Sequence, residues 1–199
     1  MHPRTKRHPL PQILLALTVL INLLSACGSG GADETAKANQ LIAEANTAID
    51  AGNVSALAAS KKNDWIFQEI RDTTFADDKV RLKAAATETI DGFNQSALKF
   101  REAARKFEEA NRLRVNDKFK EYLLLKSQEF NRNAEKMETA AAIPQAVLDS
   151  DTIETLRQKF DENKTRYEQL EKEGKDLADR AEKVRAENKD QFQSDNANK

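Results

Sequence analysis

The sequence predicts an all-α protein, an elongated antiparallel up-down bundle of about four long helices with coiled-coil-like packing. Charged residues make up 33% of its 199 residues and aromatic residues only 6%, and alanine is abundant, which is typical of long helices and coiled coils. Apolar residues recur at spacings of three and four over long stretches. Beyond Gly31, breakers are rare, since the chain has one proline there, Pro144, and three glycines.

The first predicted helical region covers residues 32–72 and is expected to be broken near Gly52. Its first part places on one face Ala38, Leu41, Ile42, Ala45, Ala48 and Ile49. Gly52 is predicted to end this part, because glycine is common just past a helix C-terminus. The apolar members of the second part are Val54, Leu57, Trp65, Ile66 and Ile70.

The second predicted helix covers residues 75–115, and Thr74 to Asp77 resembles a capping box at its start. Its seam carries large rings seven residues apart, which face alanines as in a packed heptad: Phe93, Phe100 and Phe107. The seam then becomes polar, and Asn116 or Asp117 is predicted to cap a third helix over 117–142. The alternative is one unbroken helix with a stutter, about 100 Å long.

The third helix is predicted to end at Pro144 and the following "LDSD" segment. The fourth covers residues 151–188, and Asp151 to Glu154 has the spacing of a capping box. From Ile153 to Val184, spacings of three and four alternate without a break, and Asn163 is the one strongly polar member, a type of residue that tends to fix register and pairing. Whether the seams pair within one chain or between chains stays open, so the oligomeric state is not predicted.

The amino-terminal segment has the layout of an export signal. Arg4, Lys6 and Arg7 precede an uninterrupted apolar run over residues 13–21, which is shorter than the ~20 residues of a transmembrane helix. A cleaved export signal is therefore favoured, and a permanent transmembrane helix is the alternative. The segment ends in Leu24-Ser25-Ala26-Cys27, and Cys27 is the only cysteine of the chain.

These four residues resemble the lipobox of bacterial lipoprotein precursors. The resemblance implies that a lipid is attached to the sulfur of Cys27 and that the chain is cut just before it. The resemblance implies a signal peptide (1–26) and a lipidated cysteine, which a flexible glycine-rich tether follows (27–31). The helical periodicity predicts a helical domain (32–188), and its loss predicts a frayed polar tail (189–199). With Gly28 after the cysteine, the segment resembles lipoproteins that are sent to the outer membrane. The resemblance therefore favours the outer membrane, facing the periplasm, with the inner membrane as the alternative.

The composition disfavours several classes of function. Both histidines, His2 and His8, lie in the signal peptide, so after cleavage no histidine and no free thiol would remain for the usual nucleophilic dyads, zinc sites or haem ligation. We therefore expect no enzyme, no metal and no cofactor. Without the leader the chain is mildly acidic and lacks a clustered basic surface, so no nucleic-acid partner is expected.

The function expected from the sequence is that of a lipid-anchored cell-envelope protein. Its non-catalytic helical body would act as a binding, scaffold or adaptor module for an envelope protein or a wall polymer. The alternative is a small-molecule or lipid binding or sensing bundle, with a pocket against the phenylalanine seam. Trp65 and Phe67 are weak candidates for partner contacts, because tryptophan is enriched at binding hot spots, although core packing is the favoured interpretation.

Overall fold

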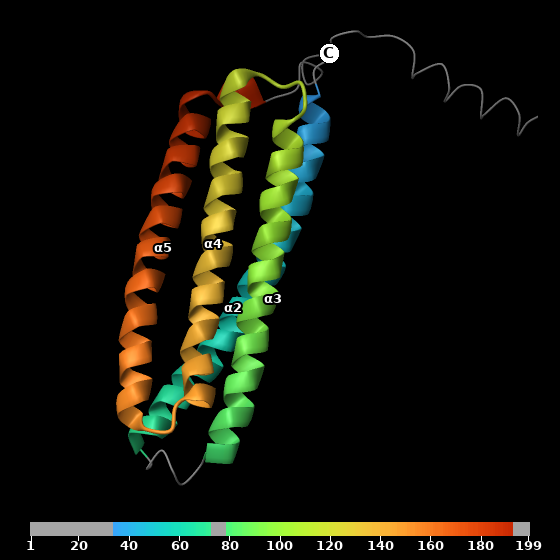
Figure 1. Cartoon of the computed structure of the whole chain (residues 1–199). Coiled ribbons are helices and arrows are strands. Elements are labelled where there is room, and N and C mark those ends of the chain that lie inside the picture. Colours follow the sequence, from blue (N-terminus) through green and yellow to red (C-terminus); the bar gives the residue numbers. More distant parts are fainter. Residues whose placement is uncertain (1–33, 73–78, 193–199) are drawn as a thin grey trace, which may run out of the picture. The chain divides into compact units, whose positions relative to one another are not determined.

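The structure is a computed structural model that describes residues 34–72 and 79–192, which belong to one compact unit, residues 33–199. These residues are helical and contain no strand, which confirms the predicted all-α fold (Figure 1). The elements are α2 (Thr35–Asp72), α3 (Lys79–Asn111), α4 (Asp117–Asp149), α5 (Ile153–Glu187) and the short 3-10 helix η2 (Lys189–Phe192).

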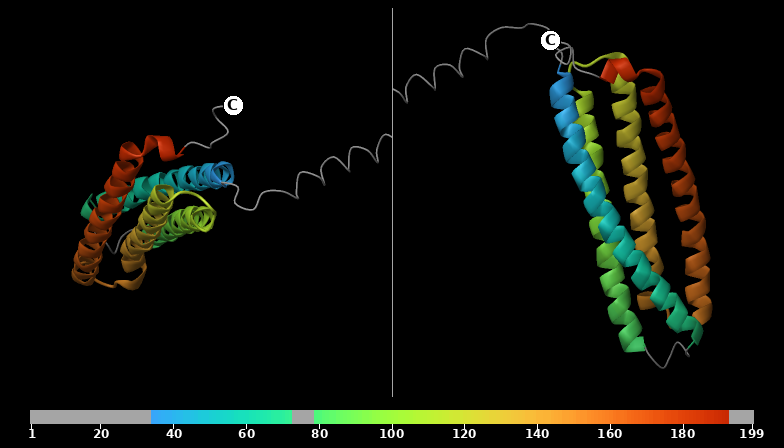
Figure 2. Two further views of the ribbon diagram at one scale, coloured as in Figure 1. Left: turned by 90° about the horizontal axis from the view of Figure 1, so that it is seen from above. Right: turned by 180° about the vertical axis from the view of Figure 1, so that it is seen from behind.

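Consecutive helices pack against each other in the order α2, α3, α4 and α5, and they alternate in direction as predicted for an up-down bundle (Figure 1). Helix α2 crosses the others obliquely. It begins beside α3 and ends near the start of α5, where the rings of Phe67 and Phe160 meet with their centroids 5.0 Å apart (Figure 2). Within the described residues, none of the helices is both long and apolar enough for a bilayer span.

Helix α2 continues through Gly52, so the predicted break there is wrong. Gly52 is buried against α3, and a Cβ atom at this position would lie 2.9 Å from Cε1 of Phe100 and 3.3 Å from Cβ of Lys99. Gly92 of α3 has the reciprocal role, since its Cβ would lie 3.0 Å from Cβ of Ala59. Both glycines permit close contact between two helices instead of ending one.

The turn at residues 112–116 separates α3 from α4, which excludes the single continuous helix. Asn116 is the N-cap of α4, as predicted, and its Oδ1 accepts a hydrogen bond of 2.8 Å from the backbone N–H of Phe119. The capping box predicted at residues 74–77 lies outside the described residues.

Helix α4 does not end at Pro144 but continues to Asp149, which corrects the predicted end. Pro144 is fully buried, and Ala146 and Val147 beyond it are each only 1% exposed. Their burial offsets the loss of one helical hydrogen bond at the proline. The N-cap of α5 is Thr152, whose Oγ1 accepts from the N–H of Thr155 at 3.3 Å, and not Asp151 as the capping-box spacing suggested.

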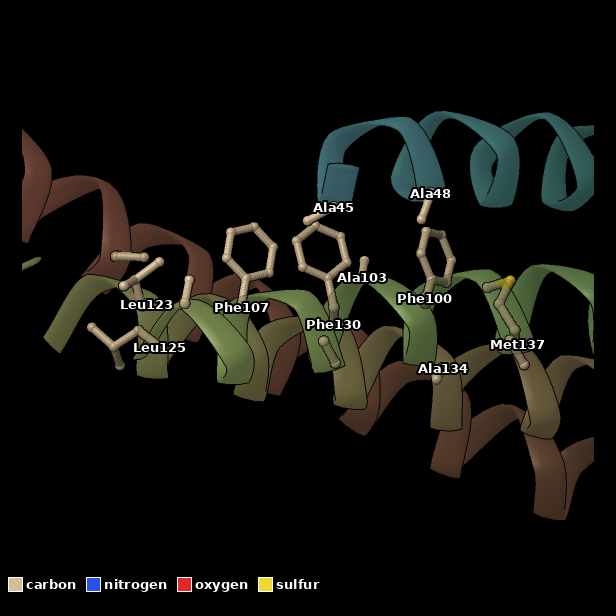
Figure 3. Packing of buried hydrophobic residues seen from close by; sticks show 14 of the residues in the cluster. Ala45, Ala48, Phe100, Ala103, Phe107, Leu123, Leu125, Phe130, Ala134 and Met137 are labelled. Atoms are coloured by element: carbon tan, nitrogen blue, oxygen red, sulfur yellow. The ribbon is translucent and has the colours of Figure 1, made fainter. Parts of the chain in front are cut away.

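The core consists of two clusters. The main cluster contains the predicted phenylalanine seam, and the rings of Phe100 and Phe107 lie 5.9 Å and 5.8 Å from that of Phe130. Small residues of α2, such as Ala45 and Ala48, pack over these rings (Figure 3). A smaller group, here called the end cluster, comprises the buried residues Ile66, Leu82, Ala86, Ala146, Val147 and Leu156.

The chain stays structured beyond the predicted end of the helical domain. The frayed tail was expected from residue 189, but residues 189–192 form η2 and the ring of Phe192 packs on Phe119 and Tyr122, at centroid distances of 4.8 Å and 5.3 Å. The rest of the predicted tail, residues 193–199, lies outside the described residues.

Candidate functional site

Cys27, the predicted lipidation site, lies outside the described residues, together with the predicted signal peptide and tether. The structure does show how Glu34, the first described residue, is held. The backbone N–H of Glu34 donates to the carbonyl oxygen of Arg114 at 3.0 Å, and the N–H of Arg114 donates to the Glu34 carboxylate at 3.0 Å. This hydrogen bond from Arg114 lowers the pKa of Glu34. The start of α2 is thereby joined to the α3–α4 turn.

Trp65 lies near the end of α2 and is half-buried against the end cluster. The guanidinium of Arg81, from α3, lies over its ring at 5.0 Å from the centroid, a cation–π distance. An open depression beside the ring is also lined by Lys61 and Glu88. One side of Trp65 therefore packs against the end cluster, and the other side remains accessible to solvent.

Phe67 is half-buried on a different side of α2. Its ring contacts Phe160 of α5 edge to face, with an interplanar angle of 73°, and the buried Ile66 stands between it and Trp65 in the sequence. Residues two positions apart on a helix do not face the same way. The structure therefore does not bring Trp65 and Phe67 together into one contact surface.

Charged side chains line the surface where α4 meets α5. Nε of Arg132 lies 3.1 Å from a Glu173 oxygen, and Nζ of Lys136 lies 3.8 Å from a Glu171 oxygen. Open depressions lie on this interface, with Gly174 lining one of them. Because both cations and carboxylates line these depressions, they offer no single sign of charge to a ligand.

Lys126 and Glu129 form the least exposed ion pair among the described residues. Their side chains are 14% and 10% exposed, and Nζ lies 2.7 Å from the carboxylate and 4.9 Å from the ring centroid of Phe130. Burial raises the pKa of Glu129, and the Lys126 ammonium opposes that rise. The two opposite charges of the pair neutralise each other inside the bundle. The pair therefore has the features of a contact that stabilises the fold.

The polar residue of the last predicted seam, Asn163, is satisfied within its own helix, since its side-chain amide donates to the carbonyl oxygen of Lys159 at 2.8 Å.

Within the described residues, no group of three or more metal-ligating side chains is placed to hold an ion. The phenylalanines proposed to line a ligand pocket are buried by neighbouring side chains, with Phe93 4% and Phe107 0% exposed.

Sequence reasoning missed one surface. Val54 and Leu57 were predicted as apolar members of the core-facing stretch, but they are 70% and 59% exposed on the side of α2 that faces away from α3. The signal that could have identified this surface is the scarcity of charge, because residues 45–60 contain one charged residue, Asp50. In a chain with 33% charged residues, an exposed helix face of this kind is unusual.

No protein-family model matches this sequence, and comparisons with curated proteins and with solved structures gave no significant match.

Proposed function

We propose that the protein is a lipid-anchored lipoprotein of the bacterial cell envelope whose helical body acts without catalysis, as a scaffold or adaptor that binds another envelope component. The observation that carries the proposal is the segment Leu24-Ser25-Ala26-Cys27, which lies between a short apolar run and a glycine-rich segment. One acyl chain gives only marginal membrane binding, whereas two or more give a stable anchor. The outer membrane is the favoured location.

The helical body suits such a role. A helix of 33 residues, the length of α3 and of α4, extends for about 50 Å at 1.5 Å per residue. The reciprocal hydrogen bonds between Glu34 and Arg114 join the residue just before α2 to the turn between α3 and α4. A load applied through the tether would therefore reach the bundle and not α2 alone.

Lipidation is tested with Cys27→Ala expressed in a lipoprotein-processing bacterium and labelled with a palmitate analogue. We expect the wild-type chain to carry label and to be cleaved before Cys27, and Cys27→Ala to carry no label. Ser29→Ala, two residues downstream, is the matched control and should be labelled normally. Label on Cys27→Ala would contradict the anchor.

The adaptor role needs a separate experiment. The tagged wild-type protein is crosslinked in intact cells, purified from membranes and compared with Cys27→Ala and with an untagged strain. We expect an envelope component that is enriched with the wild-type protein. If lipidation is normal and no specific partner is enriched, the adaptor role is wrong although the anchor stands.

A further inference from the structure

Helix α2 carries a second heptad pattern, most of which lies on the side that faces away from α3. Lys61 lies at its edge, beside a depression that Arg81 and Glu88 of α3 also line. The members of the pattern alternate at spacings of four and three and are all exposed. They are Ala43, Thr47, Asp50, Val54, Leu57, Lys61, Asp64 and Gln68, here called the outer seam. A spacing of this kind is the one by which helices pair in coiled coils. No other described element covers it, since α2 packs chiefly on α3.

The centre of the outer seam is apolar and its flanks are oppositely charged. Val54 and Leu57 are 70% and 59% exposed, which is unfavourable for large aliphatic side chains in water. Asp50 lies four residues before Val54 and Lys61 four residues after Leu57. Among the described residues, neither Asp50 nor Lys61 has an ion-pair partner in the chain.

The apolar and charged positions of two outer seams match each other only when the two helices run antiparallel. When two copies of α2 run antiparallel about a twofold axis between Ser55 and Ala56, Val54 of each copy faces Leu57 of the other, and Asp50 of each faces Lys61 of the other. In a parallel pair, by contrast, each Asp50 would meet a second Asp50, which is unfavourable.

We propose that the outer seam of α2 is a self-association surface on which a second copy of this chain packs its own α2 antiparallel. The pair buries the four exposed aliphatic side chains and forms two Asp50–Lys61 ion pairs. A single helix pair buries less than the ~1,600 Å² of a standard stable interface, so the dimer is weak and depends on concentration. The inference does not depend on the lipid anchor or on an envelope partner.

The first test is crosslinking of the full chain carrying Cys27→Ser, in which one introduced cysteine is the only thiol, with a short bis-maleimide. Two Val54→Cys residues would lie only about 5 Å apart along the paired axes, whereas two Ala43→Cys residues would lie about 37 Å apart. We therefore expect efficient dimer formation at position 54 and little at 43. Leu98→Cys, 66% exposed on α3, is the control for exposure alone.

The second test uses charge. Asp50→Lys and Lys61→Asp should each weaken dimerisation roughly ten-fold in analytical ultracentrifugation, because each reversal creates two like-charge contacts. The double variant should restore the wild-type affinity, since the exchanged charges again face each other. Circular dichroism checks that the monomer fold is unchanged.

Four outcomes would overturn the proposal. Equal crosslinking at positions 43 and 54 would indicate a parallel pair. Crosslinking at 54 no stronger than at Leu98→Cys, or a wild-type chain that stays monomeric at hundreds of micromolar, would show that a second copy does not occupy the surface. Failure of the double variant to recover affinity would exclude the Asp50–Lys61 pairing.

Discussion

The Lys126–Glu129 pair shows how a charged residue can occupy a position in an apolar seam. In the sequence, Lys126 lies three residues after Leu123 and four before Phe130, which is the spacing of the inward register of α4. The structure places its ammonium beside the Phe130 ring and the Glu129 carboxylate, so the charge is compensated where it is buried. A periodic pattern predicts the position of such a residue but not its partner.

We predict that Lys126→Met destabilises the fold by about 3 kcal/mol at pH 8, because it leaves the Glu129 carboxylate buried without its cation. The loss should be smaller near pH 4. Burial already raises the pKa of Glu129, and removal of Lys126 raises it further. A carboxyl whose pKa is higher in the folded state contributes most at low pH, and stability falls as the pH rises through that value.

Urea unfolding at both pH values measures this effect. The double variant Lys126→Met/Glu129→Met should recover most of the lost stability, because no uncompensated charge is left. Lys175→Met is the matched control from an exposed pair with Asp179, and it should leave stability close to that of the wild type. Equal losses for Lys126→Met at pH 4 and pH 8 would argue against the proposed electrostatic cause.

At the scale of the helices, the periodicity of apolar residues predicted which helices form but not where each helix ends. Four long helices, the turn after α3 and the Asn116 cap were predictable, because spacing and capping are local properties. The continuation of α2 past Gly52 and of α4 past Pro144 was not predictable from the sequence. Both depend on contacts with other helices, which override local propensity.

The same limit applies to the candidate site. The spacing of Trp65 and Phe67, two positions apart, places their side chains on different sides of a helix, but it does not predict which neighbouring helix each of them contacts. Val54 and Leu57 match a helical period as well as the core residues do, but the period belongs to the outer seam. Hydrophobicity alone could not predict which apolar residues of α2 face the core and which lie on the outer seam.

We predict that Gly92→Leu destabilises the bundle by about 2 kcal/mol, because the new side chain would force α3 away from Ala59, whose Cβ lies 3.0 Å from the position of the added Cβ. Gly174→Ala is the matched control. Its Cβ would meet the side-chain oxygen of Asn133 at 3.2 Å, a group that can turn aside, and alanine favours the helix by about 1 kcal/mol. Thermal unfolding should place the two variants on opposite sides of the wild type.

The short helix η2 allows another comparison. A chain ending at residue 188 lacks the Phe192 ring that packs on Phe119 and Tyr122, and we expect it to be less stable by about 2 kcal/mol, with faster amide exchange in the first turns of α4. A chain ending at residue 192 keeps these contacts and should match the wild type. If both truncations behave alike, the ring contacts contribute nothing measurable.

For the bundle as a whole, the distribution of the core implies unequal stability along its length. The main cluster contains the large rings of α3 and α4, whereas the end cluster has six buried residues, two of them alanines. The end cluster also lies where α2 ends, α3 begins and α4 passes into α5. Helix ends with few buried contacts open most readily, so this end should open before the rest.

Hydrogen–deuterium exchange tests this. Amides of residues 62–72, 80–88 and 144–158 should exchange faster than those of residues 97–108 and 119–134, which surround the phenylalanine seam. Leu82→Ala should increase exchange at the end cluster and leave the seam protected, whereas Phe107→Ala should affect the whole bundle. Uniform exchange would contradict this order. Trp65 and Phe67 lie at this end, so opening there would separate the Trp65 ring from the Arg81 guanidinium and the Phe67 ring from Phe160.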